Sequence, residues 1–213
     1  MREVIPEIEA LAERAREVFA AKNAAREAGL SRSRETIRHS ANAIRAVHRG
    51  EFDRASELVG RAGQLLAEAR EALADHGDVL YAGFVHDAAK EFTEARVTLA
   101  LISGGALPGY EELQVEVPAY LNGMAEAVGE LRRYLLDRLN AGEVERCTEV
   151  LEVMDEVYGI LVTFDFPDAM TGGLRRTTDN VRGILERTRG DLVLAVRQTQ
   201  LEEAMRRFGE KLG

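Results

Sequence analysis

Tryptophan is absent from this 213-residue sequence, proline occurs four times, and aromatic residues make up only 6 % of it. Alanine, leucine, glutamate and arginine dominate, and no sustained period-two alternation of apolar residues predicts a strand. The sequence therefore predicts an all-α protein with about seven long helices, in one domain over residues 1–213. No internal repeat, low-complexity tract or linker divides it.

Cysteine is also scarce: Cys147 stands alone, which excludes a disulfide framework and a thiolate metal site. Its expected role is that of a small buried residue. No signal-peptide core is visible, and no apolar run approaches the roughly 18 residues that a membrane span needs. We expect a soluble, cytoplasmic protein that makes no use of a membrane.

Seven stretches have the apolar spacing of helices and are separated by glycine or proline. Gly29 is expected to end the first helix, and the Arg175–Arg176 pair is expected to be a solvated helix end. Gly123 and Gly129 could permit a close helix crossing. The expected helices cover residues 3–28, 33–49, 51–76, 81–104, 117–141, 143–163 and 174–212.

Basic residues gather on the second of these helices, although the net charge of the chain is −9, which argues against nucleic-acid binding by the whole surface. Steps of four, seven and four place four arginines on one helical face, with a histidine beside them: Arg34, Arg38, Arg45, Arg49 and His48. Fixed guanidinium groups suit a phosphate backbone. The alternative is a solvated face that pairs with acids of a neighbouring helix.

Acidic residues flank the apolar seams of two other helices. In the 81–104 helix the seam begins at Tyr81, and Glu91 and Glu94 lie three residues apart beside it. In the 143–163 helix the flank consists of Glu145, Glu149, Glu152 and Glu156. If the two flanks converge, they form an oxygen-ligand site for Mg²⁺ or Mn²⁺. The alternative is ordinary solvent-facing glutamate, and spacing alone does not choose between Glu149, Glu152 and Glu156.

Several blocks of the sequence resemble the translin superfamily, and its TRAX branch more than translin itself. SRETIRHSANAIRAVHR is similar to the basic helix of TRAX, and KEFTEA resembles its pair of glutamates three residues apart. The most specific block is VPAYLNGMAEAVGELRRYLLDRLNAGEVE, with Tyr-Leu-x-Gly, Gly-Glu-Leu and Asn-x-Gly-acid elements. The resemblance covers most of the chain and is weaker at both ends. It suggests an archaeal form that assembles from a single type of chain.

The resemblance implies a helical protomer that assembles into a closed, hollow octamer holding RNA inside. It also implies site residues, by position in the matched blocks. Glu91 and Glu94 match the TRAX glutamate pair, Glu145 falls at the catalytic aspartate, and Glu149 falls at a further metal-binding glutamate. Glu145 departs from the family pattern because its side chain is one methylene longer than that of aspartate.

Residues and resemblance together predict a metal-dependent endoribonuclease that cleaves single-stranded RNA inside an oligomeric barrel. Glu91, Glu94 and Glu145 are the expected catalytic residues, and Glu149 joins them as the fourth ligand of Mg²⁺ or Mn²⁺. Two alternatives remain open. One is a non-catalytic, translin-like protein that binds single-stranded RNA or DNA, and the other is a helical scaffold without affinity for RNA.

Overall fold

Helices make up nearly all of the computed structural model, which describes residues 4–210, and this part of the chain contains no strand. Six helices are long and two have a single turn. In chain order they are α1 (Ile5–His48), α2 (Phe52–Ala72), α3 (Gly77–Leu80), α4 (Phe84–Ser103), α5 (Val117–Asn140), α6 (Val144–Leu161), α7 (Asp168–Thr171) and α8 (Leu174–Glu210). The predicted all-α fold is confirmed.

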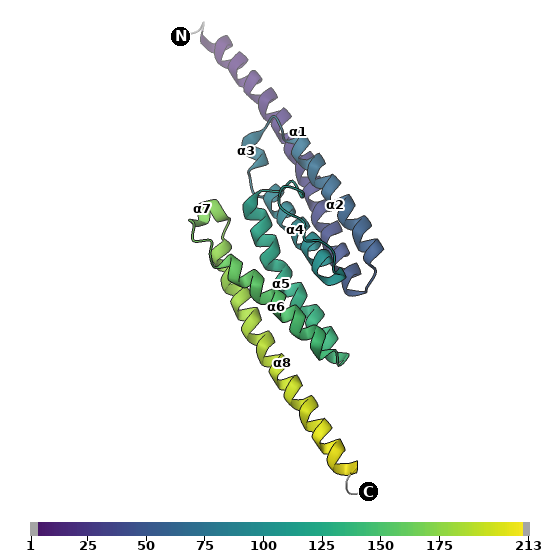
Figure 1. Cartoon of the computed structure of the whole chain (residues 1–213). Coiled ribbons are helices and arrows are strands. Elements are labelled where there is room, and N and C mark those ends of the chain that lie inside the picture. Colours follow the sequence, from purple (N-terminus) through teal and green to yellow (C-terminus); the bar gives the residue numbers. More distant parts are fainter. Residues whose placement is uncertain (1–3, 211–213) are drawn as a thin grey trace.

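The two longest helices, α1 and α8, extend in opposite directions from a central bundle (Figure 1). Within the bundle, α1 packs on α2 and α4, α4 packs on α5, and α5 packs on α6 and α8. Leucine and methionine side chains fill the core; Leu66, Leu131, Leu135, Met154 and Leu185 are almost fully buried. Because α5 contacts α4 on one side and α8 on another, it fixes those two helices relative to each other.

The predicted break at Gly29 is wrong, because α1 runs without interruption from Ile5 to His48. Gly29 is buried inside this helix, and a Cβ atom there would lie 2.6 Å from Leu73 Cδ1. Glycine is therefore required at this position for close packing and not for a left-handed helix end.

The fourth helix begins three residues later than predicted, at Phe84. Gly83 adopts φ +98°, and Tyr81 before it is 79 % exposed and does not belong to the seam. At the other boundaries, α2 ends at Ala72, and α7 adds one turn to the loop before α8. The predicted end of the last helix at residue 212 lies outside the described residues.

The two candidate crossing glycines in α5 differ. A Cβ atom at Gly123 would lie 2.5 Å from the Lys90 carbonyl oxygen and 2.7 Å from Thr93 Cβ, so α4 and α5 approach each other closely here. A Cβ atom at Gly129 would meet nothing within 4 Å. The close crossing therefore depends on Gly123 alone.

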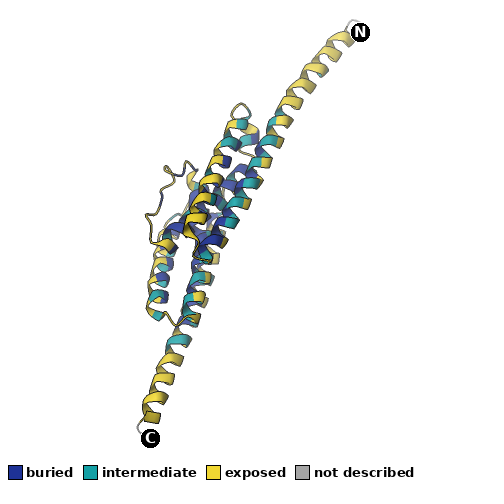
Figure 2. Ribbon diagram, turned by 90° about the vertical axis from the view of Figure 1, so that its right-hand side faces the viewer, coloured by how far each residue is buried: buried dark blue, intermediate teal, exposed yellow. Residues whose placement is uncertain are grey.

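Both protruding ends, which we call the N-terminal arm (residues 5–28 of α1) and the C-terminal arm (residues 193–210 of α8), are exposed along most of their length (Figure 2). Their exposed residues include large apolar side chains. Phe19 is 68 % exposed and Phe208 is 65 % exposed. Their exposed companions are Ile5, Ile8, Leu11 and Val18 in the first arm, and Val193, Leu194, Leu201 and Met205 in the second. Exposed apolar surface of this extent is typical of a face that another protein covers. Among residues 4–210, no helix combines the length and apolar character that crossing a bilayer requires.

Candidate metal centre

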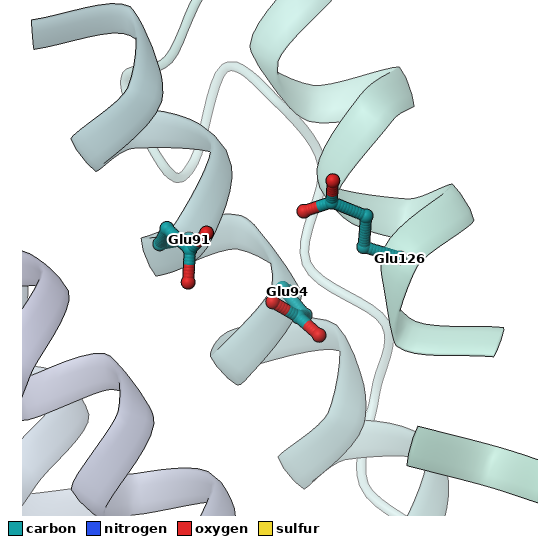
Figure 3. Close-up of side chains that lie close together, drawn as sticks. All are labelled: Glu91, Glu94 and Glu126. Carbon is teal, nitrogen blue, oxygen red and sulfur yellow. The ribbon is translucent and has the colours of Figure 1, made fainter. Parts of the chain in front are cut away.

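Three glutamates on two helices form the acid cluster: Glu91 and Glu94 of α4, and Glu126 of α5. Each offers a carboxylate oxygen, and these oxygens all lie within 4.8 Å of one another. Figure 3 shows the Glu126 side chain reaching from α5 toward the two glutamates of α4. All three side chains are partly buried.

The close α4–α5 crossing positions the cluster. Glu91 and Glu94 flank the buried Phe92 and Thr93 on α4, and Gly123 lets this segment approach α5 closely. Glu126 follows Gly123 by three residues, nearly one helical turn, so it projects toward the same part of α4. Backbone packing thus brings the carboxylates together before any ion binds.

A lysine lies against the acid cluster. Lys90 Nζ donates a hydrogen bond to Glu126 Oε1 at 2.8 Å and lies 3.9 Å from Glu91 Oε1. Burial opposes a charge on this amine, but the hydrogen bond with Glu126 and the nearby carboxylates outweigh it, so the pKa of Lys90 is raised. Lys90 therefore supplies one positive charge beside three carboxylates.

Two of the three carboxylates, those of Glu91 and Glu94, resist ionisation. Burial, together with the charges of Glu91, Glu126 and Glu130, raises the pKa of Glu94 to about 8. Burial is also the main reason that the pKa of Glu91 is raised, although Lys90 opposes the shift. Such crowding of acids is relieved by a proton or by a cation between them.

The donor set suits a hard divalent cation. Carboxylate oxygens are preferred ligands of Mg²⁺ and Mn²⁺. Oxygens on opposite sides of one ion are separated by about 4–5 Å, twice the metal–oxygen distance. The oxygens of the acid cluster, within 4.8 Å of one another, meet this requirement.

The acid cluster opens into a cleft of about 700 Å³ between α4, α5 and the start of α8. Glu91, Glu94 and Glu126 line one wall, and Arg176, Thr177 and Asn180 of α8 line another. Asn122, which is 3 % exposed, accepts a hydrogen bond from Thr177 Oγ1 at 2.7 Å. Its Nδ2 donates to the carbonyl oxygens of Pro118 and Thr171, so α5 holds the beginning of α8 in place.

The structure does not bring Glu145 or Glu149 to the acid cluster. Both are exposed on α6, which packs against α5 and α8, and Glu149 pairs with Arg146 at 2.8 Å. Within one protomer, the group of acids close enough to share an ion therefore does not include the two α6 residues. The acidic flank of α6 faces solvent because the seam beside it, including Cys147 and Met154, is directed toward the other two helices.

Glu126, which completes the cluster, was missed because it does not belong to an acidic row. The one feature of the sequence that points to Glu126 is its place in the VPAYLNGMAEAVGELRRYLLDRLNAGEVE block, four residues after Asn122 and four before Glu130. Helical spacing puts these three polar residues on one face of a helix that is otherwise rich in apolar residues. That pattern would have identified a polar face on α5.

The predicted RNA-binding histidine is buried. The His48 side chain is 4 % exposed, and its Nε2 lies 2.5 Å from Glu130 Oε2. His48 therefore connects the end of α1 to Glu130 of α5, and its side chain is not exposed beside the arginines.

The four predicted arginines, in contrast, are all exposed: Arg34, Arg38 and Arg45 lie in α1, and Arg49 caps its C-terminal end. This basic face (Arg34, Arg38, Arg45 and Arg49) lies opposite the buried side of the helix, which includes Ser33, Ser40 and Val47. Arg49 pairs with Glu51 of the α1–α2 turn at 2.6 Å, and Arg38 lies 3.9 Å from Glu35 of the same helix, so neither arginine pairs with an acid within a neighbouring helix. None of the four lines the cleft.

No protein-family model matches the sequence. The uncharacterized protein MJ0175 of Methanocaldococcus jannaschii is 31 % identical over 195 residues, which cover 89 % of this chain and 84 % of the relative.

Three solved structures are similar along most of their length. The crystal structure of AfC3PO matches with 36 % identity and a TM-score of 0.80, over 88 % of this chain and 97 % of the other. AfC3PO in complex with duplex RNA matches with 35 % identity and a TM-score of 0.76, over 90 % and 97 %. Apo-NeC3PO, at 20 % identity and a TM-score of 0.76 over 90 % and 98 %, shares the fold. Together with the sequence relationship, these matches show that the chain belongs to the translin superfamily.

Proposed function

We propose that this protein is a metal-dependent endoribonuclease that cleaves single-stranded RNA, a catalytic, TRAX-like member of its superfamily. The observation that carries the proposal is the acid cluster: three carboxylates from two helices within 4.8 Å, in an open cleft. A protein that only binds RNA has no need of such a group of acids. RNA as the ligand is supported by the related AfC3PO, whose structure includes duplex RNA.

Glu91, Glu94 and Glu126 would hold Mg²⁺ or Mn²⁺ in this cleft. Such an ion supplies Lewis acidity and an activated water for hydrolysis of a phosphodiester. The chain's own contribution is to fix the three carboxylates by the Gly123 crossing. Glu94, whose pKa is about 8, must release its proton before it can act as an anionic ligand near neutral pH.

The basic face of α1 would hold the RNA backbone without sequence preference. Its arginines are exposed and arranged along one side of a helix, as contact with successive phosphates requires. Because none of the four arginines lines the cleft, a strand that uses both surfaces has to leave the cleft and continue along the basic face of the same or of a neighbouring protomer.

A closed, hollow homo-oligomer, an octamer in the form that the family resemblance implies, would bring the two surfaces of neighbouring protomers together. The exposed apolar residues of both arms support assembly, since water contact at Phe19 and Phe208 is unfavourable. We place this assembly in the cytoplasm, where the lone Cys147 would remain a thiol.

The direct test is cleavage of end-labelled RNA, single-stranded and duplex in parallel, with Mn²⁺, with Mg²⁺ and with EDTA. We expect cleavage of the single strand with either metal and none with EDTA. Glu94→Gln and Glu126→Gln should lower the rate at least about a hundredfold, because changes even to the partners of metal ligands cost about tenfold to a hundredfold. Glu145→Gln is the matched control on α6 and should cleave normally. Full activity in both cluster variants would refute the proposal.

The alternative is a non-catalytic nucleic-acid-binding protein, and the observation in its favour is that none of the basic-face arginines lines the cleft. In that case Arg38→Glu combined with Arg45→Glu abolishes salt-sensitive binding of RNA or single-stranded DNA. Wild-type protein then yields no cleavage products in Mn²⁺. A scaffold without RNA affinity would show neither effect.

A further inference from the structure

We propose that Arg176 binds the phosphate of the nucleic acid inside the cleft, opposite the acid cluster, and that Asn122 and Thr177 are the positioning residues that hold it there. This inference rests on the proposed function, because it assigns the substrate contact of the same cleft. It replaces the expectation that Arg176 is part of a solvated helix end.

Two cationic side chains, Lys90 and Arg176, line the cleft. The Lys90 amine already has carboxylate partners: it donates a hydrogen bond to Glu126 at 2.8 Å and lies 3.9 Å from Glu91. Arg176 is exposed and has no hydrogen bond or ion pair from its side chain with the residues described, 4–210. Later in α8, Arg182 and Arg189 are both paired with carboxylates.

The charge of the acid cluster requires a cation at this position. The three carboxylates of the acid cluster and Asp87, which also lines the cleft, carry four negative charges when ionised. One divalent ion and Lys90 offset three of them, and the remaining negative charge repels a phosphodiester. A guanidinium on the opposite wall would attract the phosphate and could bind it through two parallel hydrogen bonds. The basic face of α1 does not serve this purpose, because none of its arginines lines the cleft.

The position of Arg176 is fixed through its neighbour. Thr177 Oγ1 donates to Asn122 Oδ1 at 2.7 Å, and Asn122 Nδ2 donates to the Thr171 carbonyl oxygen at 2.9 Å. Asn122 precedes Glu126 by four residues, so both lie on one face of α5. Asn122, which is hydrogen-bonded to the neighbour of Arg176, and Glu126 of the acid cluster therefore belong to the same helix, α5.

The first test compares Arg176→Gln and Arg176→Lys with Arg175→Gln, the adjacent exposed arginine that does not line the cleft. The measurements are Mn²⁺ affinity by calorimetry and kcat and KM for single-stranded RNA. We expect Arg176→Gln to raise KM about tenfold to a hundredfold, the size of a lost charged hydrogen bond. Arg176→Lys should recover part of this loss. The Mn²⁺ affinity should be the same as in wild type for both Arg176 variants, and Arg175→Gln should have the wild-type KM. Wild-type KM in Arg176→Gln, or an equal loss in Arg175→Gln, would overturn the inference.

The second test concerns the positioning residues and uses Thr177→Val and Thr177→Ser. The valine variant cannot donate to Asn122, whereas serine keeps the hydroxyl group. We expect Thr177→Val to raise KM several-fold without a change in Mn²⁺ affinity, and Thr177→Ser to behave as wild type. In a double variant, Arg176→Gln should cancel most of the effect of Thr177→Val, because both act through one contact. Additive effects on KM would contradict the positioning role.

A measurement of RNA binding distinguishes failure of this inference from failure of the proposed nuclease function. The probe is a fluorescent single-stranded oligoribonucleotide too short to reach from the cleft to the basic face, with Mn²⁺ present. If wild-type protein binds it without cleaving it and Arg176→Gln weakens binding about tenfold, the nuclease proposal fails and the phosphate contact stands. If Arg176→Gln binds it as wild type does, the phosphate contact is refuted regardless of activity.

Discussion

Lys90 and Glu126 pair across the α4–α5 crossing, with 2.8 Å between Nζ and Oε1. The acid cluster therefore has an internal counter-cation, which occupies one of the oxygens that a metal ion would use and also repels the ion.

Lys90→Met should bind Mn²⁺ about five- to tenfold more tightly than wild type at pH 9, which is above the pKa of about 8 of Glu94. The effect is modest because the lysine is partly solvated, which weakens its repulsion of the ion. Calorimetric titration measures it directly. Lys22→Met is the control, because Lys22 pairs with Asp78, outside the cleft. Weaker Mn²⁺ binding by Lys90→Met would show that the lysine supports the site instead of competing with the ion.

The raised pKa of Glu94 should make metal-free stability fall with rising pH. The pKa of this group is about 8 in the folded protein and near 4.5 without its environment. Between these values the folded state binds more protons than the unfolded state, so the free energy of unfolding decreases as pH increases. Urea denaturation in EDTA from pH 5 to pH 8.5 measures the slope.

Glu94→Gln should flatten this pH dependence, since glutamine does not titrate, and Glu145→Gln on the exposed α6 surface should leave it intact. Added Mn²⁺ should stabilise the wild type most at the alkaline end, where the proton no longer competes with the metal. An unchanged slope in Glu94→Gln would mean that Glu94 titrates normally in the folded state.

Two glycines of α5 provide a matched pair for the helix crossing. Gly123→Ala should lower the free energy of unfolding by about 1–3 kcal/mol, because its Cβ would collide with the backbone of α4 at 2.5 Å. It should also weaken Mn²⁺ binding by moving Glu126 away from α4. Gly129→Ala, with open space around it, should instead stabilise the helix by about 0.5–1 kcal/mol. Chemical denaturation of both variants tests this, and equal effects would contradict the close approach.

The exposed arms predict an oligomer in solution. Light scattering should give a mass that is a multiple of 23.5 kDa. The double variant Phe19→Glu and Phe208→Glu should shift the mass toward 23.5 kDa with unchanged helicity, because a charge in a buried apolar contact is strongly unfavourable. Tyr81→Glu changes an exposed aromatic residue outside the arms and is the control. A monomeric wild type would contradict an assembly of any size.

Helical periodicity was sufficient to predict the all-α fold and the Glu91–Glu94 pair, because both depend on spacing within one helix. The continuity of α1 was not predictable in this way. A glycine that ends a helix and a glycine that admits a neighbouring side chain look alike in the sequence, and only the approach of Leu73 to Gly29 separates them.

The third carboxylate beside the Glu91–Glu94 pair could not be predicted from spacing, because its identity depends on which helix packs against α4. The sequence favoured the glutamate-rich flank of α6, since it holds more acids than α5 does. Packing selects α5 instead, through the glycine at position 123, and leaves Glu145 and Glu149 in solvent. Arg176 was likewise interpreted as a helix end, because its place in the cleft depends on the contact of Thr177 with Asn122.

The most direct measurement of the central claim is the anomalous difference map of a crystal soaked in Mn²⁺. The account predicts a peak between the carboxylates of Glu91, Glu94 and Glu126, which disappears in Glu126→Gln. A manganese peak beside Glu145 and Glu149 on α6, with no peak at the acid cluster, would contradict it.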